Sequence, residues 1–255
     1  MSEIAFIKRL AQIVRISDLA IGRERCPLCG FGWSIRLRDE DIGIRCLRCR
    51  ASAVTQSVIA VLGKLPLDIA TADVCELSAL GPLVRYLAPR TRSLATSEFM
   101  EGVTPGSLHN GVRCENVERL SYANDSFDLC TSTEVFEHVA DDRRGFAEMR
   151  RVLRPGGWLV FSVPLTGAAT TQERTAMIDG ERHDVLPPEY HGDRYRGRQV
   201  FCYRNYGEDI VERLRDVGFP DARLCDPGLH LFGHARRIVV ARKAATPSST
   251  TSVAS

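Results

Sequence analysis

Apolar and polar positions alternate along the middle of the chain in blocks that predict strands and helices in turn. An apolar run at residues 72–77 and a second at 93–99 flank a short helical pattern from Leu83 to Leu87. This order is typical of a parallel sheet, because a crossover segment must carry the chain back before the next strand can pair beside the first.

The same alternation continues toward the C-terminus and predicts the remaining elements of the sheet. Residues 126–133 have the pattern of a buried strand, and residues 141–153 carry apolar side chains at helical spacing before an expected stop at Pro155-Gly156-Gly157. After that stop we expect a strand at 158–165, a helix at 207–217, and strands at 222–225 and 236–241. These elements predict an α/β fold whose sheet carries helices on both faces.

Three segments lie outside this alternation of predicted strands and helices. Residues 1–22 have apolar positions at helical spacing, interrupted by charges that a signal peptide would not tolerate, and predict an amphipathic helix. Residues 53–66 are expected to form a connecting helix, and residues 244–255 have the composition of a disordered end. Because no apolar run approaches the roughly 20 residues of a membrane span, we expect a cytoplasmic protein that does not enter a membrane.

Length, charge and cysteine content narrow the picture further. The 255 residues suffice for one α/β domain and a small accessory module. A formal net charge of +2 is too small to require a polyanionic partner, so nucleic acid is not favoured. Nine cysteines in a cytoplasmic chain indicate metal binding before disulfides.

Four of the cysteines form the most specific local motif of the chain. Two Cys-x-x-Cys pairs, separated by sixteen residues, lie in an irregular Gly- and Arg-rich stretch at residues 23–52, and their members are Cys26, Cys29, Cys46 and Cys49. This spacing is typical of a zinc ribbon, in which four thiolates hold one ion tetrahedrally. Four protein ligands leave no open position, so the zinc is expected to be structural. The other cysteines, Cys202 among them, are expected to be small core residues.

Four stretches of the chain together carry a family resemblance. They are VCELSALGPLVRYL (74–87), SEF (97–99), ENVERLSYANDSFDLCTSTEVFEHV (115–139) and EMRRVLRPGGWLVFSVPL (148–165). In order and spacing the chain resembles class I S-adenosylmethionine-dependent methyltransferases of the type 11 kind. The resemblance implies a Rossmann-like domain over residues 67–243, with an acceptor-site insertion at 166–205.

The resemblance also implies a cofactor site. Glu76 matches the acid that ends the first strand, and Glu98 matches the acid that binds the ribose. The turn between them departs from the family, because Ser78 stands where a glycine is usual and only Gly81 remains. The remaining candidates for cofactor binding, on the adenine side and at the end of the 126–133 strand, are Asn116, Val117 and Thr133.

The Glu134-x-x-Glu137-His138 element has two interpretations. It resembles the element that holds a divalent cation in ubiquinone-biosynthesis O-methyltransferases, and on a helix all three side chains would share one face and could converge on an ion such as Mg²⁺. Without a metal, two alternatives stay open: His138, with Glu137 beside it, is the general base, or His138 only makes structural hydrogen bonds.

The insertion is expected to build the acceptor pocket. Its central part concentrates titratable and aromatic side chains, and His191 is flanked by Glu189 and Asp193. An imidazole with neighbouring carboxylates is suited to removing a proton from a hydroxyl. We therefore predict His138, His191 and Glu137 as the catalytic residues.

The sequence supports three functions of different kinds. We favour O-methylation of a small molecule or glycan; the alternatives are an RNA-modifying methyltransferase that uses the basic ribbon to bind RNA, and a non-catalytic interaction protein with an eroded cofactor loop. A homodimer is an open option. The sequence does not identify the acceptor or the atom that is methylated.

Overall fold

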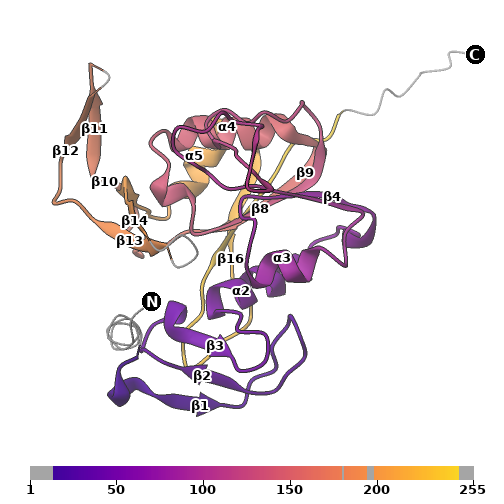
Figure 1. The fold of residues 1–255 in the computed structure, drawn as a ribbon, viewed down its shortest axis with the longest axis vertical. Coiled ribbons are helices and arrows are strands. Elements are labelled where there is room, and N and C mark those ends of the chain that lie inside the picture. Colours follow the sequence, from indigo (N-terminus) through magenta and orange to yellow (C-terminus); the bar gives the residue numbers. More distant parts are fainter. Residues whose placement is uncertain (1–13, 180, 194–197, 247–255) are drawn as a thin grey trace, which may run out of the picture.

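A six-stranded sheet forms the centre of the protein (Figure 1). The computed structural model describes residues 14–179, 181–193 and 198–246. The strands are β4 (Asp73–Glu76), β5 (Ser93–Thr96), β8 (Phe127–Thr133), β9 (Leu153–Ser162), β16 (Asp221–Cys225) and β17 (Ile238–Arg242), in the order β16-β17-β9-β8-β4-β5. The first four run parallel, whereas β17 is antiparallel to both β9 and β16. This is the predicted Rossmann-like sheet.

Helices cover both faces of the sheet (Figure 1). They are α2 (Ala53–Leu62), α3 (Pro82–Leu87), α4 (Asp142–Val152) and α5 (Ile210–Asp216). Two begin at side-chain caps: Ser52 accepts a hydrogen bond from the Thr55 amide, and Asp141 accepts one from the Arg144 amide. Such caps satisfy amides that a helix start leaves without partners.

The side chains on the two faces of the sheet belong to two separate hydrophobic cores. In β9, Leu159 and Phe161 pack in the cluster that contains the apolar sides of α4 and α5. Trp158 and Val160 point the other way, into the cluster that contains α2 and α3. Because side chains alternate along a strand, a sheet buried on both faces has continuous apolar runs, as the sequence indicated.

One boundary of the sheet differs from the prediction. β9 already begins at Leu153, so Pro155-Gly156-Gly157 lies inside the strand instead of stopping the chain before it. The pairing register between β8 and β9 shifts between Phe127 and Leu129, opposite this segment. The glycines and proline therefore form an irregularity in the strand.

The N-terminal module is a small antiparallel sheet that packs on the α/β domain. Its strands are β1 (Ala20–Gly22), β2 (Ser34–Arg36) and β3 (Ile44–Cys46), with 3-10 turns η1 (Ile16–Asp18) and η2 (Asp41–Gly43). Most of the expected helix at 1–22 lies outside the described residues, but residues 16–22 form η1 and β1, so that end of the prediction is wrong. Cys26 and Cys46 belong to the same core cluster as α2 and α3, which joins the module to the sheet.

The insertion is a set of short antiparallel pairs that the sequence did not reveal. The pairs are β10 (Gln172–Glu173) with β15 (Arg204–Asn205), β11 (Thr175–Ile178) with β12 (Glu181–Asp184), and β13 (Tyr190–Asp193) with β14 (Arg198–Phe201). The β11–β12 hairpin projects from the body of the molecule (Figure 1). The remaining elements are the β6 (Leu108–His109) and β7 (Val112–Arg113) pair, η3 (Ile69–Thr71) and η4 (Phe136–His138).

Within the described residues, none of the helices combines the length and the apolar character needed to cross a bilayer. The expected disordered end lies mainly at residues 247–255, which are outside the described part of the chain.

Candidate functional site

The carboxyl ends of β4, β5 and β8 meet at one edge of the sheet, where the order of the strands reverses. β4 pairs with β5 on one side and with β8 on the other, although β8 follows β5 in the chain. In open α/β sheets, ligands bind at such a reversal. Glu76 ends β4 here with 1% of its surface exposed, and its carboxylate accepts a hydrogen bond from the Thr131 hydroxyl. Burial raises the pKa of Glu76 to about 8.

Glu98 lies against the loop that follows β4. Its Oε1 atom accepts a hydrogen bond of 3.0 Å from the Ala79 amide, while the Ser78 hydroxyl donates to the Leu80 carbonyl over 2.9 Å. Gly81 closes the loop with a φ of 119°, a conformation that favours glycine. The structure thus brings Glu76, Ser78, Gly81 and Glu98 together at one edge.

The other expected cofactor residues occupy different environments. The Asn116 side-chain oxygen accepts from the Glu118 amide over 2.9 Å, as in an Asx turn, and Val117 packs in the core. Among the described residues, the buried Thr133 hydroxyl has no hydrogen-bond partner. Sequence reasoning missed Phe99, whose side chain directly after Glu98 is 51% exposed and offers an aromatic face at this edge.

The segment after β8 does not form the expected helical face. Glu134 has a φ of 54°, which ends the strand in a sharp turn, and η4 covers only Phe136–His138. The Glu134 carboxylate accepts from the Ser162 hydroxyl over 2.8 Å and contacts Arg236 over 3.3 Å. The expectation that Glu134, Glu137 and His138 converge from one helix is therefore wrong, because the backbone turns and Arg236 holds Glu134.

His138 instead meets residues of the insertion. Its ring lies 5.0 Å, centroid to centroid, from the ring of His191, and the Cys202 sulfur lies 3.4 Å from His191 Nε2. Glu137, 1% exposed, has its Oε1 atom 3.7 Å from His138 Nε2 and 3.8 Å from His191 Nδ1. The three expected catalytic residues thus lie together, and Cys202, expected only as a core residue, joins them.

The Cys202 thiol and the imidazoles of His138 and His191 shift one another's pKa values. Burial raises the pKa of the Cys202 thiol, but hydrogen bonds from His138 and His191 outweigh it and bring that pKa below its ordinary value. Cys202 and the nearby Glu137 carboxylate raise the pKa of His191 to about 11. Burial lowers the pKa of His138, but Cys202 and Glu137 outweigh it and raise that pKa above its ordinary value. The thiolate form of Cys202 and the protonated forms of the two rings therefore stabilise one another.

A cavity of about 200 Å³ opens beside this cluster. It is lined by Glu137, Pro164, Leu165, Thr166, Glu189, His191, Cys202, Arg204 and Asn205. The lining combines the end of β9, the insertion and the turn after β8, so a small group bound here would touch all three segments.

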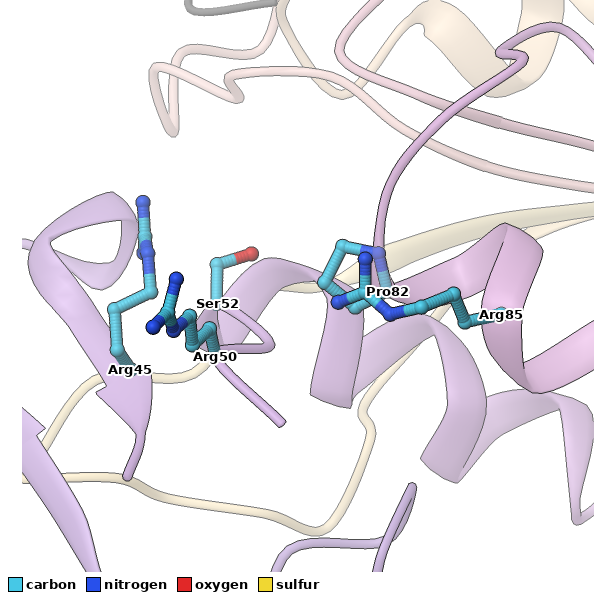
Figure 2. Close-up of a pocket in the computed structure, with 5 residues that line it drawn as sticks. All are labelled: Arg45, Arg50, Ser52, Pro82 and Arg85. Carbon is cyan, nitrogen blue, oxygen red and sulfur yellow. The ribbon is translucent and has the colours of Figure 1, made fainter. Parts of the chain in front are cut away.

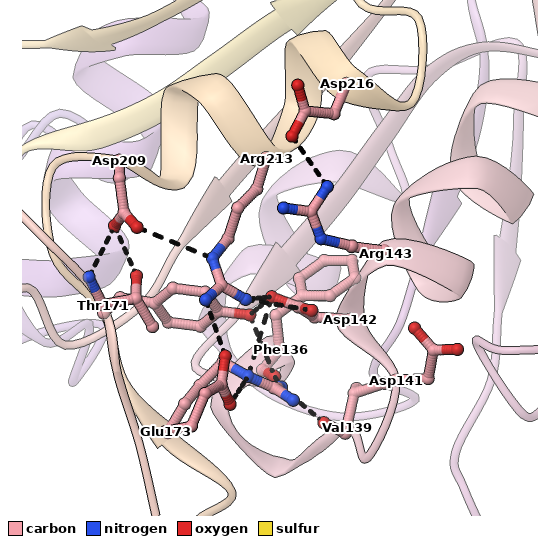
Figure 3. Close-up of polar contacts among 12 residues, drawn as sticks. Phe136, Val139, Asp141, Asp142, Arg143, Thr171, Glu173, Asp209, Arg213 and Asp216 are labelled. Atoms are coloured by element: carbon pink, nitrogen blue, oxygen red, sulfur yellow. Dashed lines mark hydrogen bonds and ion pairs between the residues drawn. The ribbon is translucent and has the colours of Figure 1, made fainter. Parts of the chain in front are cut away.

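A buried arginine, Arg204, and a partly buried one, Arg213, hold the turn after β8 against the insertion. Arg204, 4% exposed, donates to the carbonyls of Val139 over 2.5 Å and Ala140 over 2.7 Å, and to Glu173 over 3.0 Å. Figure 3 shows Arg213 reaching from α5 to Asp142 and Glu173, at distances of 3.0 Å and 2.6 Å. This network fixes the segment that carries His138.

The ribbon cysteines have a geometry that fits zinc. The Cys26 and Cys49 sulfurs are 3.6 Å apart, as are those of Cys29 and Cys46, and all four lie within 4.8 Å of one another. With Zn–S bonds of about 2.3 Å, a tetrahedral site places its sulfurs about 3.8 Å apart. Small adjustments would close the four thiolates on one ion.

A second cavity, of about 280 Å³, lies between part of the ribbon and the start of α3 (Figure 2). Arg45, Arg50 and Ser52 line it from the ribbon side and Pro82 and Arg85 from the helix side. Arg85 also donates to the Cys49 carbonyl over 3.2 Å. The lining is strongly cationic, because three of its five residues are arginines. It includes Pro82, the residue directly after Gly81.

Comparisons with known proteins agree with this architecture. Residues 83–161 match the family described as "Methyltransferase domain". An uncharacterized methyltransferase of Mycolicibacterium vanbaalenii is 54% identical over 78 residues, which cover 29% of this chain and 31% of that protein. Malonyl-[acyl-carrier protein] O-methyltransferase of Serratia marcescens is 28% identical over 109 residues, or 42% of this chain and 40% of that protein.

Among solved structures, an S-adenosylmethionine-dependent methyltransferase from Mesorhizobium loti matches 73% of this chain and 98% of its own, with a TM-score of 0.46 and 18% identity. The chain spans from 25% to 52% of the length of the first curated relatives it matches. The protein thus has a Rossmann-like sheet in which residues 83–161 are similar to a methyltransferase domain, joined to a four-cysteine module.

Replacing Arg204 by Met should destabilise the protein by about 3–5 kcal/mol, because Asp142 and three backbone carbonyls would lose a buried partner. Denaturant unfolding followed by circular dichroism measures the change. Arg237→Met is the matched control, since its pair with Glu208 is solvent-exposed and should be worth less than about 1 kcal/mol. Equal effects of the two substitutions would contradict the role given to Arg204.

Proposed function

We propose that the protein is an S-adenosylmethionine-dependent methyltransferase that methylates a hydroxyl of a small molecule or glycan. The observation that carries this proposal is the contact between Glu98 and the loop after β4, at the edge where the strand order reverses. The acid after the second strand and the turn after the first are the two parts from which such folds build a nucleotide-like cofactor site.

The chain's own residues have separate roles in holding the cofactor. Glu76 and the 77–81 loop face its methionine part, with Ser78 and Gly81 allowing the backbone to approach. Glu98 accepts hydrogen bonds from the ribose hydroxyls, Phe99 stacks on the adenine, and Asn116 and Val117 border the adenine. Thr133, whose buried hydroxyl lacks a partner among the described residues, supplies a donor at the end of β8. The bound cofactor supplies an electrophilic methyl group on a sulfonium.

The acceptor lies in the 200 Å³ cavity, which His191 lines, with its hydroxyl beside the paired rings of His138 and His191. His191, whose pKa is raised to about 11, donates a hydrogen bond and orients the acceptor oxygen. His138 takes the proton as the methyl group arrives, and Glu137 stabilises the charge that develops on the ring. The named O-methyltransferase among the relatives supports an oxygen acceptor.

The ribbon receives one structural zinc ion, held by Cys26, Cys29, Cys46 and Cys49. The strands of the ribbon have three residues each, so the ion supplies much of the stability of the module. Its charge also neutralises thiolates buried beside α2 and α3.

The arginine-lined cavity favours a second candidate function, RNA modification. Three guanidinium groups beside the cofactor loop form a site suited to phosphate. This candidate requires RNA binding that weakens steeply with salt and is lost when Arg45, Arg50 and Arg85 are replaced together by Ala. Salt-independent binding would exclude it.

Replacing Glu98 by Gln should weaken binding of S-adenosylmethionine by about 1–3 kcal/mol, because a carboxylate accepting from ribose hydroxyls is exchanged for a neutral amide. Isothermal titration calorimetry measures the affinity. Glu101→Gln is the control, since this exposed carboxylate lies three residues away and should leave the affinity unchanged. Undetectable binding by the unaltered protein would instead favour the non-catalytic interpretation.

Replacing His138 by Ala should lower kcat by about 100-fold or more while leaving cofactor affinity intact, because a general base contributes 10²–10⁴ to the rate. The acceptor is found by mass spectrometry, as the metabolite that gains one methyl group when the purified protein and cofactor are added to a cell extract. His183→Ala, an exposed position in β12, serves as the control. Full activity of His138→Ala would remove this residue from the mechanism.

A further inference from the structure

The cluster of His138, His191, Cys202 and Glu137 has the composition of a metal site that is separate from the ribbon. The ligand atoms of His138, His191 and Cys202 all lie within 4.8 Å of one another. With Zn–N bonds of about 2.0–2.1 Å and a Zn–S bond of about 2.3 Å, a tetrahedral site needs its ligand atoms about 3.3–3.6 Å apart. The Cys202 sulfur already lies 3.4 Å from His191 Nε2.

The backbone prepares His138 to be a ligand. Its Nδ1 atom lies 2.8 Å from the carbonyl oxygen of Phe201, which only accepts, so Nδ1 carries the proton and donates. The lone pair is then on Nε2, the nitrogen that faces Glu137. Metal-binding histidines are typically oriented in this way, with the second nitrogen donating to a carbonyl or a carboxylate.

Glu137 supplies an independent observation. Its side chain is 1% exposed, and neither carboxylate oxygen has a hydrogen-bond partner in the described part of the chain. A buried carboxylate without a donor is strongly disfavoured, and the nearest ring nitrogens, those of His138 and His191, are 3.7 Å and 3.8 Å away. Its backbone carbonyl accepts a hydrogen bond from the Tyr203 amide at 2.8 Å, which fixes the backbone that carries this side chain. A dication among the three other ligands would provide the missing partner.

We propose that His138, His191 and Cys202, with Glu137 as a fourth ligand, bind one zinc-like transition-metal ion at the wall of the acceptor cavity. Two imidazoles, one thiolate and one carboxylate suit Zn²⁺, whereas Mg²⁺ prefers oxygen ligands only. The site shares Glu137 and His138 with a hard-cation site at Glu134, Glu137 and His138, but it takes His191 and Cys202 in place of Glu134 and prefers a different ion.

The position of the ion gives it a role in the reaction proposed above. Glu137, His191 and Cys202 line the cavity, so an acceptor hydroxyl entering it would meet the ion. The four-ligand site would have to expand to five-coordinate for the acceptor hydroxyl to bind the ion. Coordination lowers the pKa of a hydroxyl, so the metal, and no longer His138, would then activate the acceptor. This role rests on the proposed methyl transfer, but binding of the ion does not.

Metal stoichiometry of the purified full chain tests the proposal, with Co²⁺ as the probe after the chain is stripped with a chelator. We expect two ions per chain, one in the ribbon and one in the cluster. His191→Ala and Cys202→Ser should each keep one ion and lose the other, with affinity for the second ion falling about 100-fold or more. The intensity of the sulfur-to-cobalt absorption distinguishes the sites, because four thiolates bind in one and a single thiolate binds in the other.

Two controls separate loss of a ligand from loss of the fold. Cys225→Ser removes a half-buried cysteine outside both clusters, and His183→Ala removes an exposed histidine of the insertion; both should keep two ions. Because the His191 side chain is 34% exposed, its replacement should leave the circular dichroism spectrum unchanged. One ion per chain in the unaltered protein, or two ions in a folded His191→Ala, would overturn the proposal. Calorimetry with S-adenosylmethionine is read separately, so failure of the proposed function would leave this result intact.

Discussion

The arrangement of the site depends on the burial of one positive charge. Arg204 lies in the interior, where an uncompensated guanidinium would be strongly disfavoured, so every donor must find an acceptor. Its acceptors come from the turn after β8 and from Glu173 at the start of the insertion, while Arg204 itself lies at the end of the insertion. Satisfying this single group therefore fixes where the insertion leaves the sheet edge and where it returns.

The placement of the cluster follows from that constraint. With both ends of the insertion held against the turn, the β13–β14 hairpin lies over His138, and the Phe201 carbonyl meets the His138 ring at 2.8 Å. His191 on β13 and Cys202 directly after β14 are then held on the same side as Glu137. Segments about 60 residues apart in the chain thus build one group of ligands, and the fold brings them together without a contribution from sequence proximity.

Local patterns predicted the sheet and its helices well because their physical causes are local. The helix at residues 53–62 begins at the cap Ser52, and the buried strands 127–133 and 158–162 have apolar side chains on both faces. The cluster lacked such a signal. The short hairpins of the insertion carry mixed polar sequences without a clear period, and the spacing of Glu134, Glu137 and His138 suggested a helix that the positive φ of Glu134 excludes. Cys202 resembled an ordinary core residue, because burial alone does not reveal which side chain lies opposite.

The contact between the ribbon and the sheet has a consequence for how such proteins can be assembled in evolution. Cys26 and Cys46 share a core with Val58 and Leu62 of α2, and Arg236 beside β17 joins Asp41 of the ribbon, at 2.6 Å, to Glu134 at the end of β8. A recombination event with a crossover between residues 52 and 53 would divide this core and leave Arg236 without one of its carboxylates. Exchanging the ribbon alone would therefore expose part of this core and separate Asp41 from Arg236, so the ribbon and the sheet stabilise each other.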